Sequence, residues 1–493
     1  MRPASKYPQL YQVNTRVWLT RLTRELGRPA TLDDISTVSL ERLAGLGFEW
    51  LYFLGVWQTG KVGRELSRSN PQWRAEYLRV LPDLTEEDIC GSPFAVTGYT
   101  AAVEIGGNHG LQGLRERVNG SGMRLMLDFV PNHTAIDHPW ASSHPDFFIQ
   151  GTETDLQEEP RNYILVDTGQ GSKIFAHGRD PYFPGWPDTL QLNYANPALH
   201  QAMLVELIKA AALCNGLRCD MAMLILPEIF QRTWDLQAEP FWPQAIQAIR
   251  EKDPDFTFMA EVYWDLEDAL LAQDFDYAYD KRLYDLLRDG KVSEIHEHLG
   301  ASPTQQIHLA RFLENHDELR AAALFPTNQH QAAAVITYFS PALRFYHTGQ
   351  LEGYRHKISI HLCRGPDEQG DPVLQQFYQR LLEVLRLDIL QSGVWQQLST
   401  KPAWEGNDSY TTFITGAWSG INNRRVLVIV NYAPHQSQGY LQIPFQEFAG
   451  EEVILKDLLG SDLYERQGDG LITTGLYLDL PAWGYHVFEV RKL

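Results

Sequence analysis

Short apolar runs alternate with amphipathic stretches over residues 1–390 of the 493-residue chain. Residues 49–55 and 124–130 are almost unbroken apolar runs, typical of strands that are buried on both faces. Residues 197–214 instead place their large apolar side chains on one helical face. By these criteria the sequence predicts strands over 10–19, 49–55, 124–130, 216–220, 256–261, 275–277, 307–313 and 343–346, and helices over 37–46, 111–118, 197–214, 245–249, 281–299 and 374–387.

Strands that alternate with helices in this number predict an α/β fold, a (β/α)8 TIM barrel. Residues 138–196 lack sustained periodicity and are rich in Pro, Gly and aromatic residues, so we expect an irregular domain inserted after the third strand. After residue 390, short strands recur between turns, which predicts a C-terminal antiparallel β-sandwich. The predicted domains are the barrel at 1–137 and 197–390, the insertion at 138–196 and the sandwich at 391–493.

Three acidic residues follow the ends of predicted strands. Asp220 and Glu261 close the fourth and fifth strands, and Asp317 follows the seventh. The carboxyl ends of parallel barrel strands share one rim, so these carboxylates are expected to converge on one pocket. Two such groups about 5–5.5 Å apart, one ionised and one protonated, are what a retaining cleavage of a glycosidic bond requires.

The neighbours of these acids suggest how their charges are set. Arg218 lies two residues before Asp220, so in a strand both side chains point to the same side, and the guanidinium would keep Asp220 ionised. Glu261 stands in an apolar stretch that ends at Trp264, where partial desolvation would favour its protonated form. We expect Asp128 to pair with Arg218 or to cap its loop, as structural support rather than a substrate contact.

The bulk composition excludes some classes of partner. A net charge of −20 argues against nucleic acid or an anionic membrane as the main partner and suits a neutral substrate. Aromatic residues make up 12% of the chain, with 13 Trp, and their faces can stack on sugar rings, although most are expected in the core. The oligomeric state is not indicated by any of these features.

Cysteine usage and the N-terminal segment bear on location. The four cysteines contain no CxxC pair, so neither a zinc site nor a disulfide framework is expected. No signal peptide or bilayer-spanning apolar run is visible in the sequence. These features predict a protein of the reducing cytoplasm.

Four short segments occur in order and at the expected strand ends: residues 128–133 (DFVPNH), 216–220 (GLRCD), 260–261 (AE) and 315–317 (NHD). Together they resemble the four short motifs of the α-amylase family of retaining glycoside hydrolases. The resemblance covers the whole architecture, which in that family is a barrel with an inserted domain and a C-terminal β-domain.

The resemblance implies a role for each matching residue. Asp220 would be the nucleophile, Glu261 the general acid/base, and Asp317 the residue that holds the sugar in its distorted transition-state geometry. Substrate contacts would come from further residues at the motifs and near them: Tyr99, as the family's stacking tyrosine, His133, Arg218, Trp264 and His316.

The resemblance also bears on a metal. Calcium-dependent members carry Lys and His three and four residues after the nucleophile, where this chain has Met223 and Leu224, and a metal-binding Asp where it has Gln191. Asn132 remains, but one amide oxygen does not make a calcium site. We therefore expect no cofactor and no structural calcium. The alternative is a different site built from other acids of the insertion: Asp146, Asp155 or Asp188.

The leading functional hypothesis is a retaining hydrolase of α-1,4 bonds in maltooligosaccharides or glycogen- and starch-type chains. One alternative is an α-glucosyltransferase or isomerase of the same family, because both reactions share the covalent intermediate. Another is a catalytically inactive member that acts as a carbohydrate-binding or regulatory protein. The complete set of three carboxylates favours an enzyme.

Overall fold

A computed structural model describes residues 5–169, 171–421 and 424–493. Its centre is a closed barrel of eight parallel strands in the order β1-β14-β13-β12-β11-β10-β5-β2, which confirms the predicted fold class. The barrel strands are β1 (Gln9–Asn14), β2 (Trp50–Leu54), β5 (Arg124–Phe129), β10 (Gly216–Cys219), β11 (Thr257–Ala260), β12 (Tyr277–Tyr279), β13 (Leu309–Arg311) and β14 (Leu343–His347).

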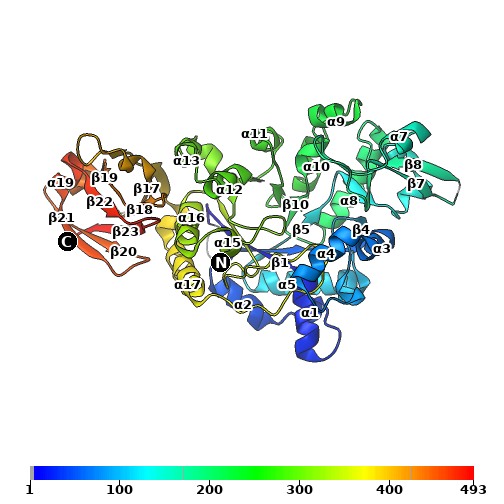
Figure 1. Ribbon diagram of the computed structural model, residues 1–493, viewed down its shortest axis with the longest axis horizontal. Helices are drawn as coiled ribbons and strands as arrows, with labels where there is room; N and C mark the ends of the chain where they lie inside the picture. Colours follow the sequence, from blue (N-terminus) through cyan, green and yellow to red (C-terminus); the bar gives the residue numbers. More distant parts are fainter. Residues whose placement is uncertain (1–4, 170, 422–423) are drawn as a thin grey trace.

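Helices surround this barrel (Figure 1). The longer ones are α1 (Thr15–Leu26), α2 (Thr37–Gly45), α5 (Gly107–Gly120), α8 (Pro197–Ala211), α10 (Trp242–Arg250), α12 (Lys281–Arg288), α13 (Val292–Leu299), α16 (Thr327–Phe339) and α17 (Pro372–Leu385). Shorter ones are α9 (Pro227–Trp234), α11 (Glu267–Leu271), α14 (Pro303–Gln306), α15 (Ala321–Leu324) and α18 (Asp388–Ser392). None of the helices in the described ranges has the length and apolarity needed to cross a membrane.

Two of the predicted elements were wrong in extent, and one helix was not predicted. The strand predicted over 10–19 ends at Asn14, because the Asn14 side chain accepts the Val17 N–H and caps α1. The helix predicted over 281–299 is broken into α12 and α13 at Gly290, whose φ of 66° is left-handed. Helix α16 was not predicted, because its residues from Ala332 onward are all buried and leave no polar face to mark the period.

Two excursions extend the rim of the barrel. The one after β2 contains β3 (Trp57–Thr59), α3 (Lys61–Ser69), α4 (Pro71–Val80) and β4 (Val96–Ala101). The one after β5 contains β6 (His133–Ala135), α6 (Trp140–Ser143), α7 (Glu153–Glu158), β7 (Tyr163–Asp167), β8 (Ser172–Ala176) and β9 (Thr189–Gln191). Strands β6 and β9 pair at the root of this insertion, and the β7–β8 hairpin projects at the right of Figure 1.

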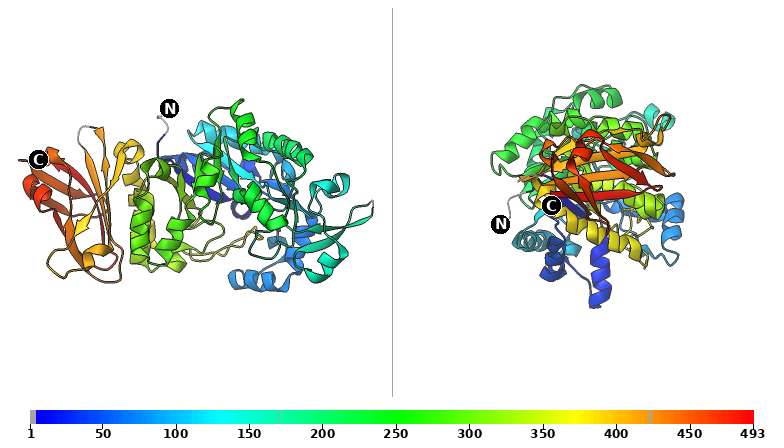
Figure 2. Two further views of the ribbon diagram at one scale, coloured as in Figure 1. Left: turned by 90° about the horizontal axis from the view of Figure 1, so that it is seen from above. Right: turned by 90° about the vertical axis from the view of Figure 1, so that its left-hand side faces the viewer.

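The C-terminal part forms two antiparallel sheets, drawn in orange and red at the end opposite the insertion (Figures 1 and 2). The larger sheet contains β15 (Val394–Gln397), β17 (Phe413–Ser419), β18 (Arg425–Asn431), β20 (Glu452–Asp457), β21 (Leu463–Gln467) and β23 (Tyr485–Lys492). The smaller contains β16 (Thr400–Lys401), β19 (Ser437–Leu441) and β22 (Leu476–Leu480), and helix α19 (Gly468–Thr473) follows β21. Leu427 and Leu478 belong to the apolar cluster between the sheets.

Candidate active site

The fourth and fifth barrel strands place two carboxylates side by side. Strand β10 pairs in parallel with β11 so that Cys219 lies opposite Ala260, and Asp220 and Glu261 are the next residues along. Both side chains turn into the buried end of the barrel, with 4% and 2% of their surface exposed. The predicted neighbours on the rim are therefore neighbours in space.

A single guanidinium joins these carboxylates. Nη1 of Arg218 lies 2.7 Å from Asp220 Oδ1, and Nη2 lies 2.8 Å from Glu261 Oε2. Nη1 is also 3.5 Å from Asp128 Oδ1. Arg218 is fully buried. The predicted pairing of Arg218 with Asp220 is present, and its contacts with these carboxylates set their charge and position. A contact of Arg218 with substrate stays a prediction.

Glu261 is held by two further donors. The N–H of Met221 donates to Oε2 at 2.7 Å, and the hydroxyl of Tyr263 donates to Oε1 at 2.9 Å. Met221 has a left-handed backbone with φ of 42°, which is rare for a residue with a side chain. This turn directs the Met221 N–H towards Glu261, immediately after Asp220.

Burial separates the protonation states of the two acids. Desolvation raises the pKa of Asp220 to about 6, opposed by the Arg218 cation. Desolvation also raises the pKa of Glu261 to about 8, again against Arg218. Burial therefore favours the protonated form more strongly at Glu261 than at Asp220, which is the difference that a general acid and a nucleophile would need.

Asp128 supports the site from the neighbouring strand. Its carboxylate accepts hydrogen bonds from the Tyr52 hydroxyl and, at 3.2 Å, from the Gly55 N–H. Burial raises its pKa to about 6, and Arg218 opposes this shift. The expected contact of Asp128 with Arg218 is present, and the loop that Asp128 holds is the one after β2.

Asp317 lies further from its strand than the other two acids. Strand β13 ends at Arg311, six residues earlier, and the Asn315 side chain accepts the Asp317 N–H at 2.8 Å. The Asp317 side chain is 39% exposed, and Oδ2 lies 3.0 Å from His316 Nε2. Lys357 donates to the main-chain oxygen of Asp317. Asp317 is thus the accessible member of the three.

A cavity of about 380 Å³ begins at His316 and Asp317. The cavity is also lined by residues of α4 and of the segment after β14, including Trp73, Tyr77 and Lys357. His316 is itself positioned by Gln12, whose amide nitrogen is 2.9 Å from Nδ1. Burial lowers the pKa of His316 to about 4, so the ring is neutral at pH 7.

The other predicted substrate contacts are less accessible. Tyr99 is 5% exposed, its ring stacks on Phe129, and its hydroxyl donates to the Val130 carbonyl at 3.0 Å. His133 is 4% exposed and lies against Trp186. Trp264 is half-buried in a left-handed turn with φ of 64° and packs edge-on against Tyr182 of the insertion.

Sequence reasoning missed two residues at the site. The ring of Phe94 packs 5.1 Å from the Arg218 guanidinium and 5.4 Å from the His316 ring. No periodic pattern marks Phe94, because it lies in the loop before β4. The Tyr263 contact could have been inferred, since residues two apart in extended chain face the same side.

A known protein family matches the part of the chain that carries this site. Residues 95–357, more than half of the chain, match the family model described as the alpha-amylase catalytic domain. The chain belongs to the alpha-amylase family. The family assignment agrees with the resemblance drawn from the four motifs and with a glycosidase active site.

Individual members of the alpha-amylase family are only distantly similar. Alpha-amylase MalA from Haloarcula japonica is 23% identical over 267 residues, which are 52% of this chain and 36% of that protein. The trehalose synthase of Pimelobacter sp. is 29% identical over 147 residues, covering 27% of this chain and 25% of that protein. The chain therefore aligns with about a third or less of these relatives' length.

Among solved structures, a noncanonic maltogenic alpha-amylase AmyB from Thermotoga neapolitana superposes with a TM-score of 0.69 at 18% identity. The superposition covers 98% of both chains. At this identity the likeness concerns the fold, including the C-terminal domain that lies beyond the matched family region.

The calcium ligands of some alpha-amylase family members do not fit this chain. Nε2 of Gln191 donates to the main-chain and side-chain oxygens of Asn132, both at 3.0 Å, and to the Leu192 carbonyl at 3.1 Å. An amide NH2 group thus occupies the point where these oxygens converge. Asn132 Nδ2 in turn donates to Gln191 Oε1. The oxygens are already paired, and a cation would have to displace a donor.

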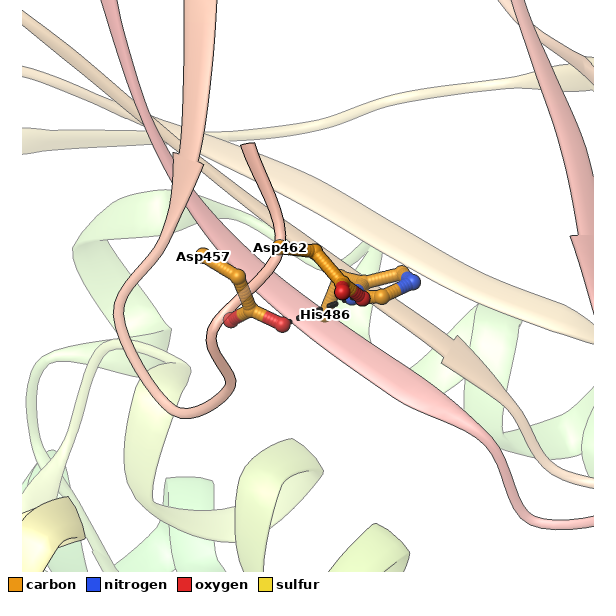
Figure 3. Close-up of side chains that lie close together, drawn as sticks. All are labelled: Asp457, Asp462 and His486. Atoms are coloured by element: carbon orange, nitrogen blue, oxygen red, sulfur yellow. Dashed lines mark hydrogen bonds and ion pairs between the residues drawn. The ribbon is translucent and has the colours of Figure 1, made fainter. Parts of the chain in front are cut away.

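The acids of the insertion that were considered for a different calcium site do not form a cluster among the described residues. Asp155 caps α7, and Asp146 accepts from Asn196. Burial raises the pKa of Asp188 to about 6. Within the described residues, the group of three whose spacing would suit a metal lies in the C-terminal domain: Asp457, Asp462 and His486 (Figure 3). There His486 Nδ1 is already 2.7 Å from Asp457 Oδ2.

We expect a calcium chelator to leave the protein's stability almost unchanged. A bound ion stabilises the folded state by mass action, so removing one would lower the melting temperature. Thermal unfolding in EDTA should therefore match unfolding in buffer to within about 1 °C, on the scale on which 1 kcal/mol shifts Tm by a few degrees. A loss of several degrees that added calcium restores would contradict this expectation.

Proposed function

We propose that the protein is a retaining α-glucan hydrolase that cleaves α-1,4 bonds of maltooligosaccharides or glycogen- and starch-type chains. The observation that carries this proposal is the pairing of Asp220 and Glu261 on the two terminal nitrogens of Arg218. One guanidinium that contacts both acids keeps them close, as suits the short separation of a retaining pair. The larger rise of the Glu261 pKa on burial suits the same mechanism.

In the proposed reaction, the Asp220 carboxylate attacks the anomeric carbon while Glu261 donates its proton to the departing glycosidic oxygen. Glu261 then takes a proton from water, which attacks the same carbon and releases Asp220. The Met221 N–H and the Tyr263 hydroxyl would hold Glu261 through its change from acid to base. Asp317, exposed at the cavity, would contact hydroxyls of the distorted sugar.

The decisive experiment is to follow the first product of maltooligosaccharide cleavage by NMR. Two displacements at one carbon restore the α-anomer, whereas a single displacement by water gives the β-anomer. Release of reducing sugar that is lost in Glu261→Gln would assign the reaction to this site. A β-anomer as the initial product would exclude the mechanism, and no turnover of any maltooligosaccharide would exclude the substrate.

Transfer to a sugar acceptor is the second candidate. It is favoured by the similarity to a trehalose synthase over residues that amount to 27% of this chain. Tyr182 and Phe183 of the insertion are also 57% and 66% exposed, and Tyr182 adjoins Trp264 in the loop that follows Glu261. Such rings could hold an acceptor sugar. Products longer than the substrate, formed from maltoheptaose, would establish transfer, and shorter chains alone would establish hydrolysis.

The pH dependence of kcat/KM should be bell-shaped, with limbs near the two pKa values. Activity requires Asp220 ionised, so it should fall below about pH 6, and it requires Glu261 protonated, so it should fall above about pH 8. The two limbs belong to the interacting pair rather than to either acid alone. Tyr263→Phe removes a donor to the Glu261 carboxylate and should move the alkaline limb upward while leaving the acid limb in place. An alkaline limb unchanged in this variant would remove Tyr263 from the control of Glu261.

We further propose a reducing compartment for this reaction, because the sequence has only four cysteines and no disulfide framework.

A further inference from the structure

Two of the free cysteines meet where two distant loops touch beside the cavity. Ile89, in the excursion after β2, forms an antiparallel bridge with Leu362, in the segment after β14. On one side of this bridge the Cys90 N–H donates to the His361 carbonyl at 2.8 Å, and on the other the Cys363 N–H donates to the Asp88 carbonyl at 2.9 Å. Cys90 and Cys363 therefore flank the bridge on the same face, since side chains alternate along extended chain.

The two thiols have different surroundings. Nη1 of Arg16 donates to the Cys90 sulfur at 3.2 Å, whereas the Cys363 thiol donates to the Glu87 carbonyl at 3.3 Å. The neighbouring Cys363 and the Arg16 cation lower the pKa of Cys90 to about 6, while Cys90 and burial raise the pKa of Cys363. Cys90 therefore ionises more readily than Cys363.

The other cysteines provide an internal contrast. Cys214 and Cys219 are fully buried, and burial raises the pKa of Cys214 to about 12. Cys90 and Cys363 are both partly exposed. Reactivity towards a dissolved oxidant is therefore concentrated at one pair of the four.

We propose that Cys90 and Cys363 form a redox-active pair that closes reversibly to a disulfide with low-molecular-weight disulfides, and that closure lowers activity at the adjoining glucan site. The Cys90 thiolate attacks one sulfur of the small disulfide, forming a mixed disulfide and releasing one small thiolate. Cys363 then loses its proton and attacks the Cys90 sulfur, which releases the second small thiolate. The protein loses two electrons and two protons, and the small disulfide becomes two thiols.

The two loops that carry Cys90 and Cys363 also carry residues that contact the active site. Phe94, four residues after Cys90, packs over Arg218 and His316. Lys357, six residues before Cys363, donates to the Asp317 carbonyl and lines the cavity. A disulfide brings its sulfurs to about 2.05 Å, closer than two unbonded sulfur atoms can lie, so closure must draw the two loops together. Phe94 and Lys357 would then shift against the groups they position.

The test treats the folded, reduced protein with oxidised glutathione and maps its cysteines by peptide mass spectrometry. We expect a Cys90–Cys363 crosslink that dithiothreitol reverses, with Cys214 and Cys219 unmodified until the chain unfolds. Brief alkylation at pH 7 should label Cys90 at least about tenfold faster than Cys363, as their different thiolate fractions require. Equal labelling rates, or no crosslink under conditions that oxidise a model dithiol, would overturn the pair.

Two variants separate the steps. Cys363→Ser should stop at the mixed disulfide between Cys90 and glutathione, and Cys90→Ser should leave Cys363 unmodified. Both should keep the activity of the reduced enzyme, with melting temperatures recorded to show that they fold. A mixed disulfide that forms on Cys363 instead would reverse the assigned order and overturn the proposal.

The effect on activity rests on the proposed function, and the thiol chemistry does not. We expect kcat/KM for a maltooligosaccharide to fall severalfold in the oxidised wild type and to recover with dithiothreitol, whereas Cys363→Ser should not show the crosslink-dependent loss. A quantitative crosslink with unchanged kcat/KM would overturn the regulatory step. A protein inactive on glucans in both states, but able to form the crosslink, would instead contradict the proposed function.

Discussion

Asp220→Asn is expected to abolish turnover of maltooligosaccharides while leaving the fold intact. The amide has the shape of the carboxylate and can still accept from Arg218 Nη1, now 2.7 Å from Asp220 Oδ1, but it lacks the negative charge that attacks the anomeric carbon. Without the covalent intermediate, kcat/KM should fall by at least about four orders of magnitude, a loss of more than ~5 kcal/mol of transition-state stabilisation. Reducing-sugar release at pH 7 measures this directly.

A matched control is Asp235→Asn. Asp235 is exposed and ends α9 in a left-handed conformation, with φ of 55°, that Asn also adopts. This variant should retain full activity and an unchanged melting temperature. If Asp220→Asn kept activity within about tenfold of wild type, equivalent to only ~1.4 kcal/mol, Asp220 could not be the nucleophile.

Arg218→Met should destabilise the protein by about 3–5 kcal/mol, because it leaves buried carboxylates without their shared cation. Arg218 lowers the pKa of Asp128, Asp220 and Glu261 against the effect of burial. In the variant all three folded-state pKa values should therefore rise further above their unfolded values. A carboxyl group whose folded pKa is raised loses stability as pH rises from the unfolded pKa through the folded pKa. The loss caused by Arg218→Met should thus be larger at pH 8 than at pH 5.

Urea unfolding at the two pH values tests this expectation, with Arg344→Met as the control. Arg344 is equally buried, but its hydrogen bonds go to the carbonyls of Tyr338, Tyr7 and Leu390 rather than to carboxylates. Its loss should be costly but should change less between pH 5 and pH 8 than the loss of Arg218, because Arg344 lowers the pKa of one carboxyl group, Glu49, rather than three. If the Arg218 variant showed the same destabilisation at pH 5 and pH 8, the guanidinium would not be what sets the charge of the three acids.

The sequence predicted those parts of the site that depend on adjacent strands or on adjacent residues of one strand. Asp220 and Glu261 follow their strands at once, and parallel pairing brings consecutive strand ends together whatever the rest of the chain does. The interaction of Arg218 with Asp220 also follows from two-residue spacing in extended chain. The second interaction, of Arg218 with Glu261, could not be predicted in this way, because it joins different strands through a side-chain rotamer.

Two elements show where the spacing of apolar residues fails to predict secondary structure. Apolar residues stand on both sides of Asn14, Thr15 and Arg16 in the segment predicted as one strand, yet the cap formed by the Asn14 side chain ends the strand and starts a helix. Helix α16 is buried on all sides, so burial erases the polar stripe that would have revealed it. In the first case a local cap determined the structure, and in the second the surroundings of the segment hid its pattern.

The sequence by itself determined the alternation of strands and helices, the C-terminal β-domain and the order of the three acids, because these depend on local periodicity and on residue type. Only the tertiary structure decided which loops cover those acids. Phe94, Lys357, Cys90 and Cys363 lie in irregular segments far apart in the chain, and barrel closure brings them to one rim. A local pattern of apolar residues shows which face of a segment is buried. Contacts between two loops depend instead on how the whole chain between them is folded.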